Sequence, residues 1–191
     1  MIKDKTAIVG IGQTAFGKKL PESELELACT AVLNALDDAG IDRAEVDGLA
    51  SYTQESNSEV ELARNLGLGD ITYFSQVGYG GGAGPGVIGN LAMAVATGQC
   101  RVGVAWRSRK RASGAVRRPW SKSSSSLQEE IAVNYTRPFG VIRPVDEIAL
   151  LARRYMHEYG ATREHLANVA LAQRKYANNN PNAQMFAKTL S

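Results

Sequence analysis

The sequence predicts a layered α/β protein built on a largely parallel sheet. Short apolar runs rich in branched residues alternate with longer segments that have helical spacing. Glycines at 40, 98 and 160 stand where C-terminal helix caps are expected. A repeated strand–helix alternation places consecutive strands parallel to one another. With 191 residues, 44% of them hydrophobic, the chain is long enough to bury a sizeable core.

The first expected strand is residues 7–12, a branched apolar run that ends at glycines. The first expected helix covers residues 22–39, in which apolar positions recur with a period of about 3.6 and Gly40 follows as a cap. The same criteria predict strands at 46–52, 71–77 and 101–106, and helices at 59–66 and 87–97.

The composition changes after Trp106. Residues 107–144 are predicted to form a long basic loop that contains serines and prolines. Two helices are expected in residues 145–159 and 162–178. We therefore divide the chain into an α/β domain at 1–106, the basic loop at 107–144, and a helical continuation at 145–191.

Positive charge is concentrated at the start of this loop. The net charge is only +3, but an acid-free stretch holds seven cations, which are Arg107, Arg109, Lys110, Arg111, Arg117, Arg118 and Lys122. The stretch is interpreted either as a solvated loop or as the rim of a site for a phosphorylated ligand. No aromatic interleaving or nucleic-acid motif accompanies the charge, so nucleic acid is not the expected partner.

Other function classes lack support in the sequence. No apolar run approaches the roughly 20 residues of a membrane span, and the N-terminus does not resemble a signal peptide, so a cytoplasmic location is expected. Cys29 and Cys100 lie far apart without metal-binding spacing, and the chain has only two histidines. Neither a disulfide scaffold nor a metal site is predicted.

A glycine-rich turn, VGYGGGAGPGVIGN at residues 77–90, links an expected strand to an expected helix. It has no lysine and cannot be a P-loop. Residues 84–89 match the Gly-x-Gly-x-x-Gly dinucleotide pattern, which would make the protein an NADP-binding oxidoreductase with Arg107 or Arg109 facing the 2′-phosphate. Alternatively, the helix start binds developing negative charge through backbone N–H groups. The glycines could also permit close helix packing at a subunit contact.

Several short motifs along the chain resemble the thiolase superfamily. They are AIVGIGQT at 7–14, ALDDAGI at 35–41, DGL at 47–49, LGL at 66–68, AVATG at 94–98, RKYA at 174–177 and NPNA at 180–183. The likeness runs along essentially the whole chain and is strongest to the sterol-carrier or lipid-transfer-protein branch. It implies a thiolase-like layered αβα sandwich, of which this chain holds the N-terminal half and the loop region.

The resemblance also implies that a nucleophile is missing. Thiolases begin their third helix with a reactive cysteine, and the spacing back from Gly98 places that position at Gly81. A covalent thioester intermediate needs a thiolate, which glycine cannot supply. The sequence is most similar to the cysteine-less, thiolase-like steroid side-chain aldolases. These proteins cleave β-hydroxyacyl-CoA thioesters to a ketone and a shorter acyl-CoA, such as propionyl-CoA.

The expected site residues follow from this resemblance. Gly81 would donate its backbone N–H to the thioester oxygen, with Tyr79 as an acid–base candidate. Six residues would contact the CoA thioester, and these are Gly80, Gly82, Arg107, Phe139, Val141 and Ile142. The CoA thioester is the expected substrate, and no further cofactor is implied.

The resemblance implies partners as well. A homodimer would form through the third strand and helix, and a zinc-ribbon and OB-fold protein that binds acyl-CoA could join it. Family members are about twice as long as this chain, and their second half carries the acid–base residues. A non-catalytic acyl-CoA-binding subunit, or a protein resembling acetyl-CoA acetyltransferase, therefore remains an alternative to the lyase.

Overall fold

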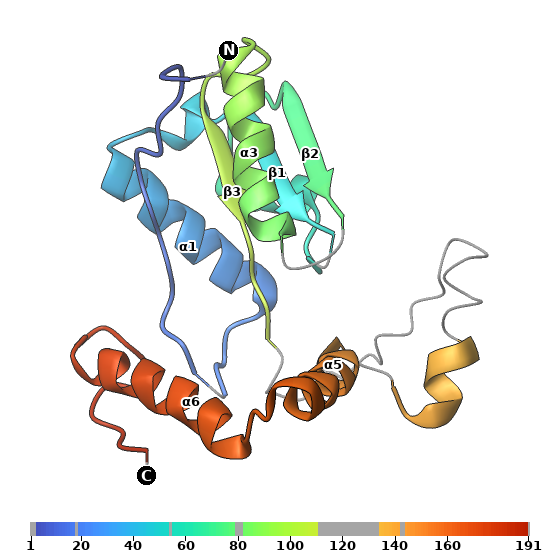
Figure 1. Ribbon diagram of the computed structural model, residues 1–191. Helices are drawn as coiled ribbons and strands as arrows, with labels where there is room; N and C mark the ends of the chain where they lie inside the picture. The colour runs from blue at the N-terminus through green and yellow to red at the C-terminus, as the bar shows by residue number, and fades with distance from the viewer. Residues whose placement is uncertain are drawn as a thin grey trace. The chain divides into compact units, whose positions relative to one another are not determined.

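The computed structural model describes residues 3–17, 19–53, 55–78, 82–110, 134–141 and 144–190. The chain forms two compact units, Met1–Ala115 and Val116–Ser191 (Figure 1).

The first unit is built on a parallel sheet of three strands in the order β2-β1-β3. The strands are β1 (Gly48–Tyr52), β2 (Tyr73–Val77) and β3 (Gly103–Trp106). Gly48 stands opposite Tyr73 on one side and Gly103 on the other. This common register places the carboxyl ends of all three strands at one edge of the sheet.

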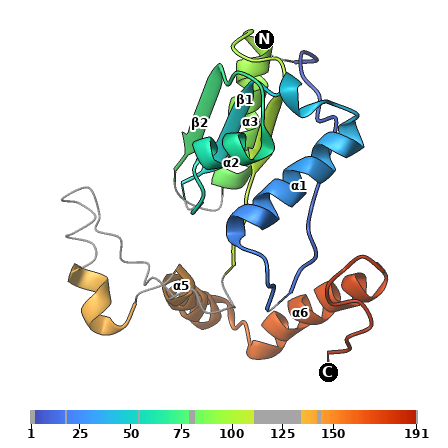
Figure 2. The ribbon, with the colours of Figure 1, turned by 180° about the vertical axis from the view of Figure 1, so that it is seen from behind.

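Helices cover both faces of the sheet. The helix α3 (Ala83–Ala96) lies on one face, and α1 (Glu24–Ala39) and α2 (Glu59–Leu66) lie on the other (Figures 1 and 2). Alternate residues of β1 serve the two layers: Leu49 packs with α1 and α2, whereas Ala50 and Tyr52 pack with α3. The layered αβα fold with a parallel sheet is the one predicted.

The starts of α1 and α2 satisfy their own backbone groups. Ser23 and Ser58 are the N-caps, and Glu26 and Glu61 complete a capping box at each. The helix α3 begins at Ala83, four residues before the expected start at residue 87. Glycine and Pro85 are tolerated there because the first-turn N–H groups need no intrahelical partner.

The prediction of a strand at residues 7–12 was wrong. These residues form an extended segment without strand pairing. The segment lies along α1, where the Ile11 N–H donates to Asp38 Oδ2 over 2.9 Å. A Cβ at Gly10 or Gly12 would collide with helix backbone oxygens, so glycine permits this approach. A strand needs a hydrogen-bonded neighbour, and no described residue offers one at this position.

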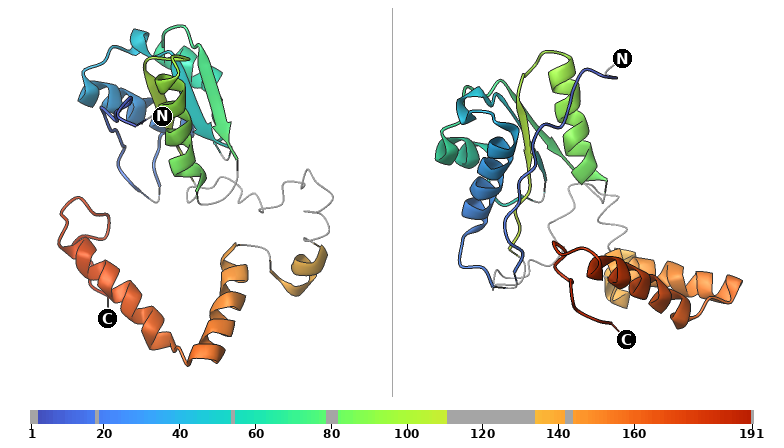
Figure 3. Two further views of the ribbon diagram at one scale, coloured as in Figure 1. Left: turned by 45° about the horizontal axis from the view of Figure 1, so that its top comes forward. Right: turned by 90° about the vertical axis from the view of Figure 1, so that its left-hand side faces the viewer.

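The second unit contains the short 3₁₀ helix η2 (Arg137–Phe139) and the helices α5 (Pro144–Tyr159) and α6 (Arg163–Asn178), shown from two sides in Figure 3. Both long helices match the expected bounds to within one residue. Neither has a buried residue within the described chain. Among the described residues, no helix combines the length and apolarity that crossing a membrane requires.

Asp47 holds together the starts of the three strands. Its carboxylate accepts the N–H groups of Arg101 and Val102 at 2.9 Å, before β3. Its carbonyl accepts the Thr72 N–H at 2.8 Å, before β2. One residue therefore fixes where β1, β2 and β3 begin relative to one another.

We expect Asp47→Ala to lower the unfolding free energy of the protein that carries this chain by about 2–3 kcal/mol, because two backbone donors lose a charged acceptor. Asp47→Asn should lose less, since one amide oxygen remains. Asp70→Ala, at an exposed position, is the control. Denaturant unfolding measures the differences, and equal effects at positions 47 and 70 would contradict the assigned role.

Candidate functional site

The loops at the carboxyl edge of the sheet form the candidate site. Residues after β1, β2 and β3 leave the sheet at this edge, where ligands bind in many open α/β sheets. The first two loops are joined by a bond from the Thr53 N–H to the Val77 carbonyl over 3.0 Å. Tyr79, Gly80 and Gly81 belong to the second loop and lie outside the described residues.

The start of α3 differs from the other two helix starts of this unit. Gly82 is its N-cap and provides no side-chain hydrogen bond, in contrast to Ser23 and Ser58. The N–H groups of Ala83 and Gly84 therefore have no side-chain cap. Together with the positive end of the helix dipole, they form an environment that favours negative charge.

The space around this helix start is open. A Cβ built on Gly82 or Gly84 would meet no heavy atom within 4 Å among the described residues. Packing inside the described chain therefore does not require glycine at either position. A group from outside, either a substrate or a second protein chain, can approach the backbone here.

The dinucleotide pattern does not fit this geometry. Gly84, Gly86 and Gly89 all lie inside α3. In a dinucleotide site, the first glycine forms the tight turn between strand and helix, so that the backbone can approach the pyrophosphate. The placement of these glycines gives no support to the oxidoreductase interpretation.

Two glutamates bind the segment that follows β3. Glu55 Oε2 accepts the Ser108 N–H at 2.8 Å, and Glu24 Oε1 accepts the Lys110 N–H at 2.7 Å. Ser108 is buried and donates its hydroxyl to the Glu24 carbonyl over 2.7 Å. Ser56 donates its hydroxyl to Glu24 and accepts from Arg109 at 3.0 Å. These bonds fix the start of the basic stretch to the first unit.

Arg107 lies beside this cluster. Its guanidinium carbon stands 5.0 Å from the centroid of the Tyr52 ring, and its Nε is 3.7 Å from Glu55 Oε1. The Arg107 side chain is 48% exposed, whereas that of Glu55 is 0% exposed. Glu55 Oε1 is buried and accepts no hydrogen bond from the residues that the structure describes. The arginine thus presents a partly exposed cation at the carboxyl edge.

The two carboxyl groups have opposite electrostatic environments. Burial raises the pKa of Glu55, and nearby Glu24 adds to the rise, although the Ser108 N–H and the arginines at 107 and 109 oppose it. Burial also acts to raise the pKa of Glu24. The bonds from Ser56 and Lys110 and the nearby cations outweigh this effect, so the pKa of Glu24 is lowered.

Three further expected site residues follow residue 116 in the sequence. Phe139 is 81% exposed in η2 and Val141 is half-buried, both in the second unit. Ile142 lies outside the described residues. No group of three or more His, Cys, Asp or Glu side chains within the described ranges could hold a metal ion.

Glu24 and Glu55 were missed by the sequence interpretation. Glu55 and its partner Ser108 are 53 positions apart, and Glu24 and Lys110 are 86 apart. Neither glutamate belongs to a local motif. Only the acid-free, basic character of the segment after β3 could have suggested that carboxylates from elsewhere pair with it.

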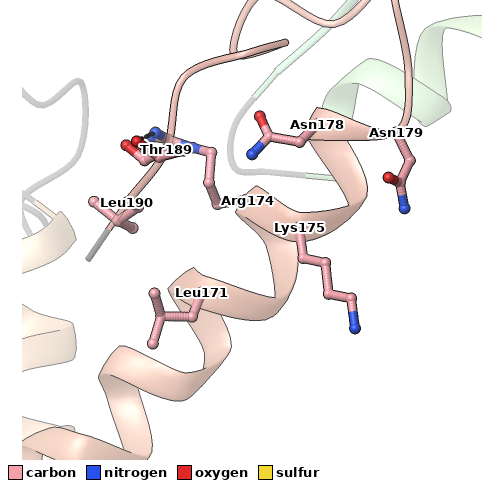
Figure 4. Close-up of a pocket in the computed structure, with 7 residues that line it drawn as sticks. All are labelled: Leu171, Arg174, Lys175, Asn178, Asn179, Thr189 and Leu190. Carbon is pink, nitrogen blue, oxygen red and sulfur yellow. Dashed lines mark hydrogen bonds between the residues drawn. The ribbon is translucent and has the colours of Figure 1, made fainter.

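The second unit has a pocket of about 230 Å³ between α6 and the C-terminal tail (Figure 4). Arg174 reaches from α6 to the tail and donates to the carbonyl of Lys188 over 2.9 Å. The lining residues are Leu171, Arg174, Lys175, Asn178, Asn179, Thr189 and Leu190. With Arg174 bound to backbone carbonyls, we interpret this pocket as the seam where the tail packs on the helix.

Comparison of the sequence with known proteins identifies one family. Residues 6–190 match the family described as "Thiolase, N-terminal domain". The chain is 44% identical over 188 residues to a steroid side-chain-cleaving aldolase of Thermomonospora curvata, covering 97% of the chain and 48% of that protein. It is 42% identical over 195 residues to the 17-hydroxy-3-oxo-4-pregnene-20-carboxyl-CoA lyase of Mycobacterium tuberculosis, covering 100% of the chain and 50% of that lyase.

A solved structure shares the fold. The Ltp2-ChsH2(DUF35) aldolase superposes with a TM-score of 0.86 at 44% identity, covering 97% of this chain and 46% of that one. The chain spans about half the length of the curated relatives it matches.

We expect the stability difference between Glu55→Gln and the unmodified protein to depend on pH. Because folding raises the pKa of Glu55, its contribution is fully present below the unfolded value of 4.5 and is lost as pH rises through the folded pKa. The variant should therefore gain stability relative to the unmodified protein between about pH 4.5 and neutrality. Thermal unfolding at several pH values measures the gain.

Glu61→Gln is the matched control for this titration. The Ser58 backbone and hydroxyl groups lower the pKa of Glu61, so its contribution is lost as pH falls. Its variant should change in the opposite direction. A Glu55→Gln difference that stays flat with pH would show that the carboxyl group is not perturbed by burial.

Proposed function

This chain belongs to the thiolase family as a thiolase N-terminal domain, and on that premise we propose that the protein carrying it is a carbon–carbon lyase. The resemblance of the sequence to thiolases is confirmed, as is the layered α/β fold. The proposed substrate is a β-hydroxyacyl-CoA of the steroid side-chain type. Similarity to an aldolase and a carboxyl-CoA lyase at 42–44% identity supports this class of reaction.

The observation that carries the proposal is the start of α3. This helix start has no side-chain cap, and no described residue packs closely enough to require glycine at positions 82 and 84. No cysteine, serine, lysine or histidine occurs in residues 77–90, so the turn cannot supply a thiolate for acyl transfer. A helix start whose N–H groups have no side-chain cap, in a turn without a nucleophile, suits a reaction in which charge develops on oxygen without an acyl-enzyme.

Retro-aldol cleavage is such a reaction. A base takes the proton of the β-hydroxyl, its oxygen forms a ketone, and the bond between the α and β carbons breaks. The electron pair passes to the thioester as an enolate, whose oxygen would be stabilised by N–H groups at the start of α3, that of Gly81 included. A proton added at the α carbon then gives the shorter acyl-CoA, such as propionyl-CoA. No redox cofactor enters this sequence of steps.

The general base of the reaction is not proposed to be a side chain of the glycine turn. Tyr79 is the acid–base side chain of the turn, but an ordinary tyrosine has a pKa near 10 and is rarely ionised at neutral pH. We therefore assign the base to the half of the relatives' length that this chain does not span. Gly80, Gly82, Arg107, Phe139, Val141 and Ile142 remain proposed contacts of the CoA thioester, and 1–106, 107–144 and 145–191 remain the proposed domains.

Association is part of the proposal. The strand β2 is an edge strand, and the exposed Ile88 and Met93 on α3 are 46% and 48% accessible. An open edge beside exposed apolar residues supports a homodimer through β2 and α3. Similarity to the Ltp2-ChsH2(DUF35) aldolase, an assembly by its name, supports a partner protein, proposed to be a zinc-ribbon and OB-fold module. A cytoplasmic location is proposed with it.

The direct test is turnover. The protein carrying this chain, with and without a co-expressed partner, should convert a steroid side-chain β-hydroxyacyl-CoA to a ketone and propionyl-CoA, detected by mass spectrometry. Binding of acyl-CoA without cleavage would favour the non-catalytic subunit. Quenching of NADPH fluorescence without acyl-CoA binding would overturn the proposal in favour of an oxidoreductase.

Substitution at Gly84 separates packing from catalysis. Gly84→Ala should raise the unfolding free energy by about 0.5–1 kcal/mol, because alanine favours the helix and meets no neighbour. It should nevertheless lower kcat/KM at least about tenfold by obstructing approach to the helix start.

Gly89→Ala is the matched control, since Gly89 is also helical and open but lies further along α3. It should stabilise the protein similarly and leave kcat/KM unchanged. Equal loss of activity in both variants would indicate that α3 contributes a subunit contact and not a substrate platform.

A cysteine at position 81 tests the proposed alignment with thiolases. Gly81→Cys should create a thiol that reacts rapidly with iodoacetamide, since a helix start lowers the pKa of a thiol. Saturating acyl-CoA should protect it from the reagent. Mass spectrometry measures both rates, and a slow, unprotected thiol would place the vacated nucleophile position elsewhere.

A further inference from the structure

We propose that Glu55 is a positioning residue that holds the Arg107 guanidinium toward a phosphate group of coenzyme A. The inference rests on the proposed function, because it takes the CoA thioester as the ligand. It adds a residue that does not touch the substrate but sets the orientation of one that does.

Arg107 is held on two sides. The Tyr52 ring lies under its guanidinium at 5.0 Å, and Glu55 Oε1 faces its Nε at 3.7 Å. Glu55 approaches Nε, and the two terminal nitrogens carry the other four N–H donors of the guanidinium. These are the nitrogens that form a fork for phosphate oxygens. With the side chain 48% exposed, the fork is accessible to a ligand.

The backbone of this segment is held without help from the charge of Glu55. Lys110 is bound by Glu24, and Ser108 donates its hydroxyl to the Glu24 carbonyl. The one backbone bond that Glu55 accepts, from the Ser108 N–H, could be accepted equally by a glutamine oxygen. The cations that the Glu55 charge faces in this segment are Arg107 and, with a smaller effect on its pKa, Arg109.

Retention of that charge is costly. The Glu55 side chain is fully buried, and within the described part of the chain its Oε1 has no hydrogen-bond partner. Burial raises the pKa of this carboxyl group, which means that ionisation is disfavoured here. A buried, incompletely bonded charge in a site region is more readily explained by function than by stability.

The experiment measures the dissociation constant of coenzyme A by calorimetry on the protein that carries this chain. The variants are Glu55→Gln, Arg107→Gln and the double variant, with Asp70→Asn as the control for loss of one exposed acidic charge. Arg107→Gln should weaken binding about ten- to thirtyfold, and Glu55→Gln about three- to tenfold. The double variant should be no weaker than Arg107→Gln alone, because Glu55 acts through Arg107.

Two further readouts separate positioning from a structural role. Glu55→Asp keeps the charge and should restore part of the affinity lost in Glu55→Gln. The effect of Glu55→Gln should also fade at low pH, where the native carboxyl is protonated. The groups acting on Glu55 are Glu24 of α1, the Ser108 N–H, and the arginines at 107 and 109 after β3. Dephospho-coenzyme A, which lacks the 3′-phosphate, identifies the phosphate that Arg107 contacts. If Arg107→Gln still weakens binding of dephospho-coenzyme A, the contact is with the diphosphate. If the effect disappears, the contact is with the 3′-phosphate.

Each outcome is decisive. If the unmodified protein does not bind coenzyme A, both the proposed function and the positioning role are overturned. If it binds and Arg107→Gln has no effect, or Glu55→Gln binds as tightly as the unmodified protein, the positioning role alone is overturned. Additive losses in the double variant also overturn it. Thermal unfolding of each variant confirms that affinity is compared between folded proteins.

Discussion

The parallel register of the sheet depends on the hydrogen bonds of Asp47. Its carboxylate and carbonyl bind backbone groups before β3 and before β2, while the residue itself leads into β1. Because the three strands begin at one level and run parallel, they also end at one level. Gly78, the loop that holds Glu55, and residues 107–110 leave the sheet at that edge for this reason.

The three helix starts of the first unit show how the fold separates stability from function. At α1 and α2, serine and glutamate satisfy the backbone N–H groups reciprocally. At α3, the N-cap is a glycine without a capping side chain, and no described residue lies within 4 Å of a Cβ built on Gly82 or Gly84. Local rules for stability are followed where a helix only packs and are broken where a ligand is proposed to bind.

The same contrast appears in the two glutamates at the carboxyl edge. Glu24 is fully bonded, and its surroundings favour ionisation. Glu55 is close by, but burial dominates its environment, and one of its oxygens accepts no hydrogen bond from any described residue. Two identical side chains therefore have pKa values shifted in opposite directions, because different numbers of hydrogen-bond donors reach their oxygens. In a domain that matches half the length of its relatives, this edge is where the proposed chemistry is concentrated.

The sequence by itself determined the elements whose signals are local. Apolar periodicity and caps located α1, α2, α5 and α6. The resemblance of short motifs indicated the thiolase family, which the family match confirms. Tertiary structure alone decided three other features. Residues 7–12 pack as an extended segment on α1, because strand formation depends on a neighbour and not on composition. The start of α3 at Ala83 could not be predicted from periodicity, because the glycines before residue 87 carry no apolar signal. The contacts of Glu55 join residues more than 50 positions apart, and only folding brings such residues together.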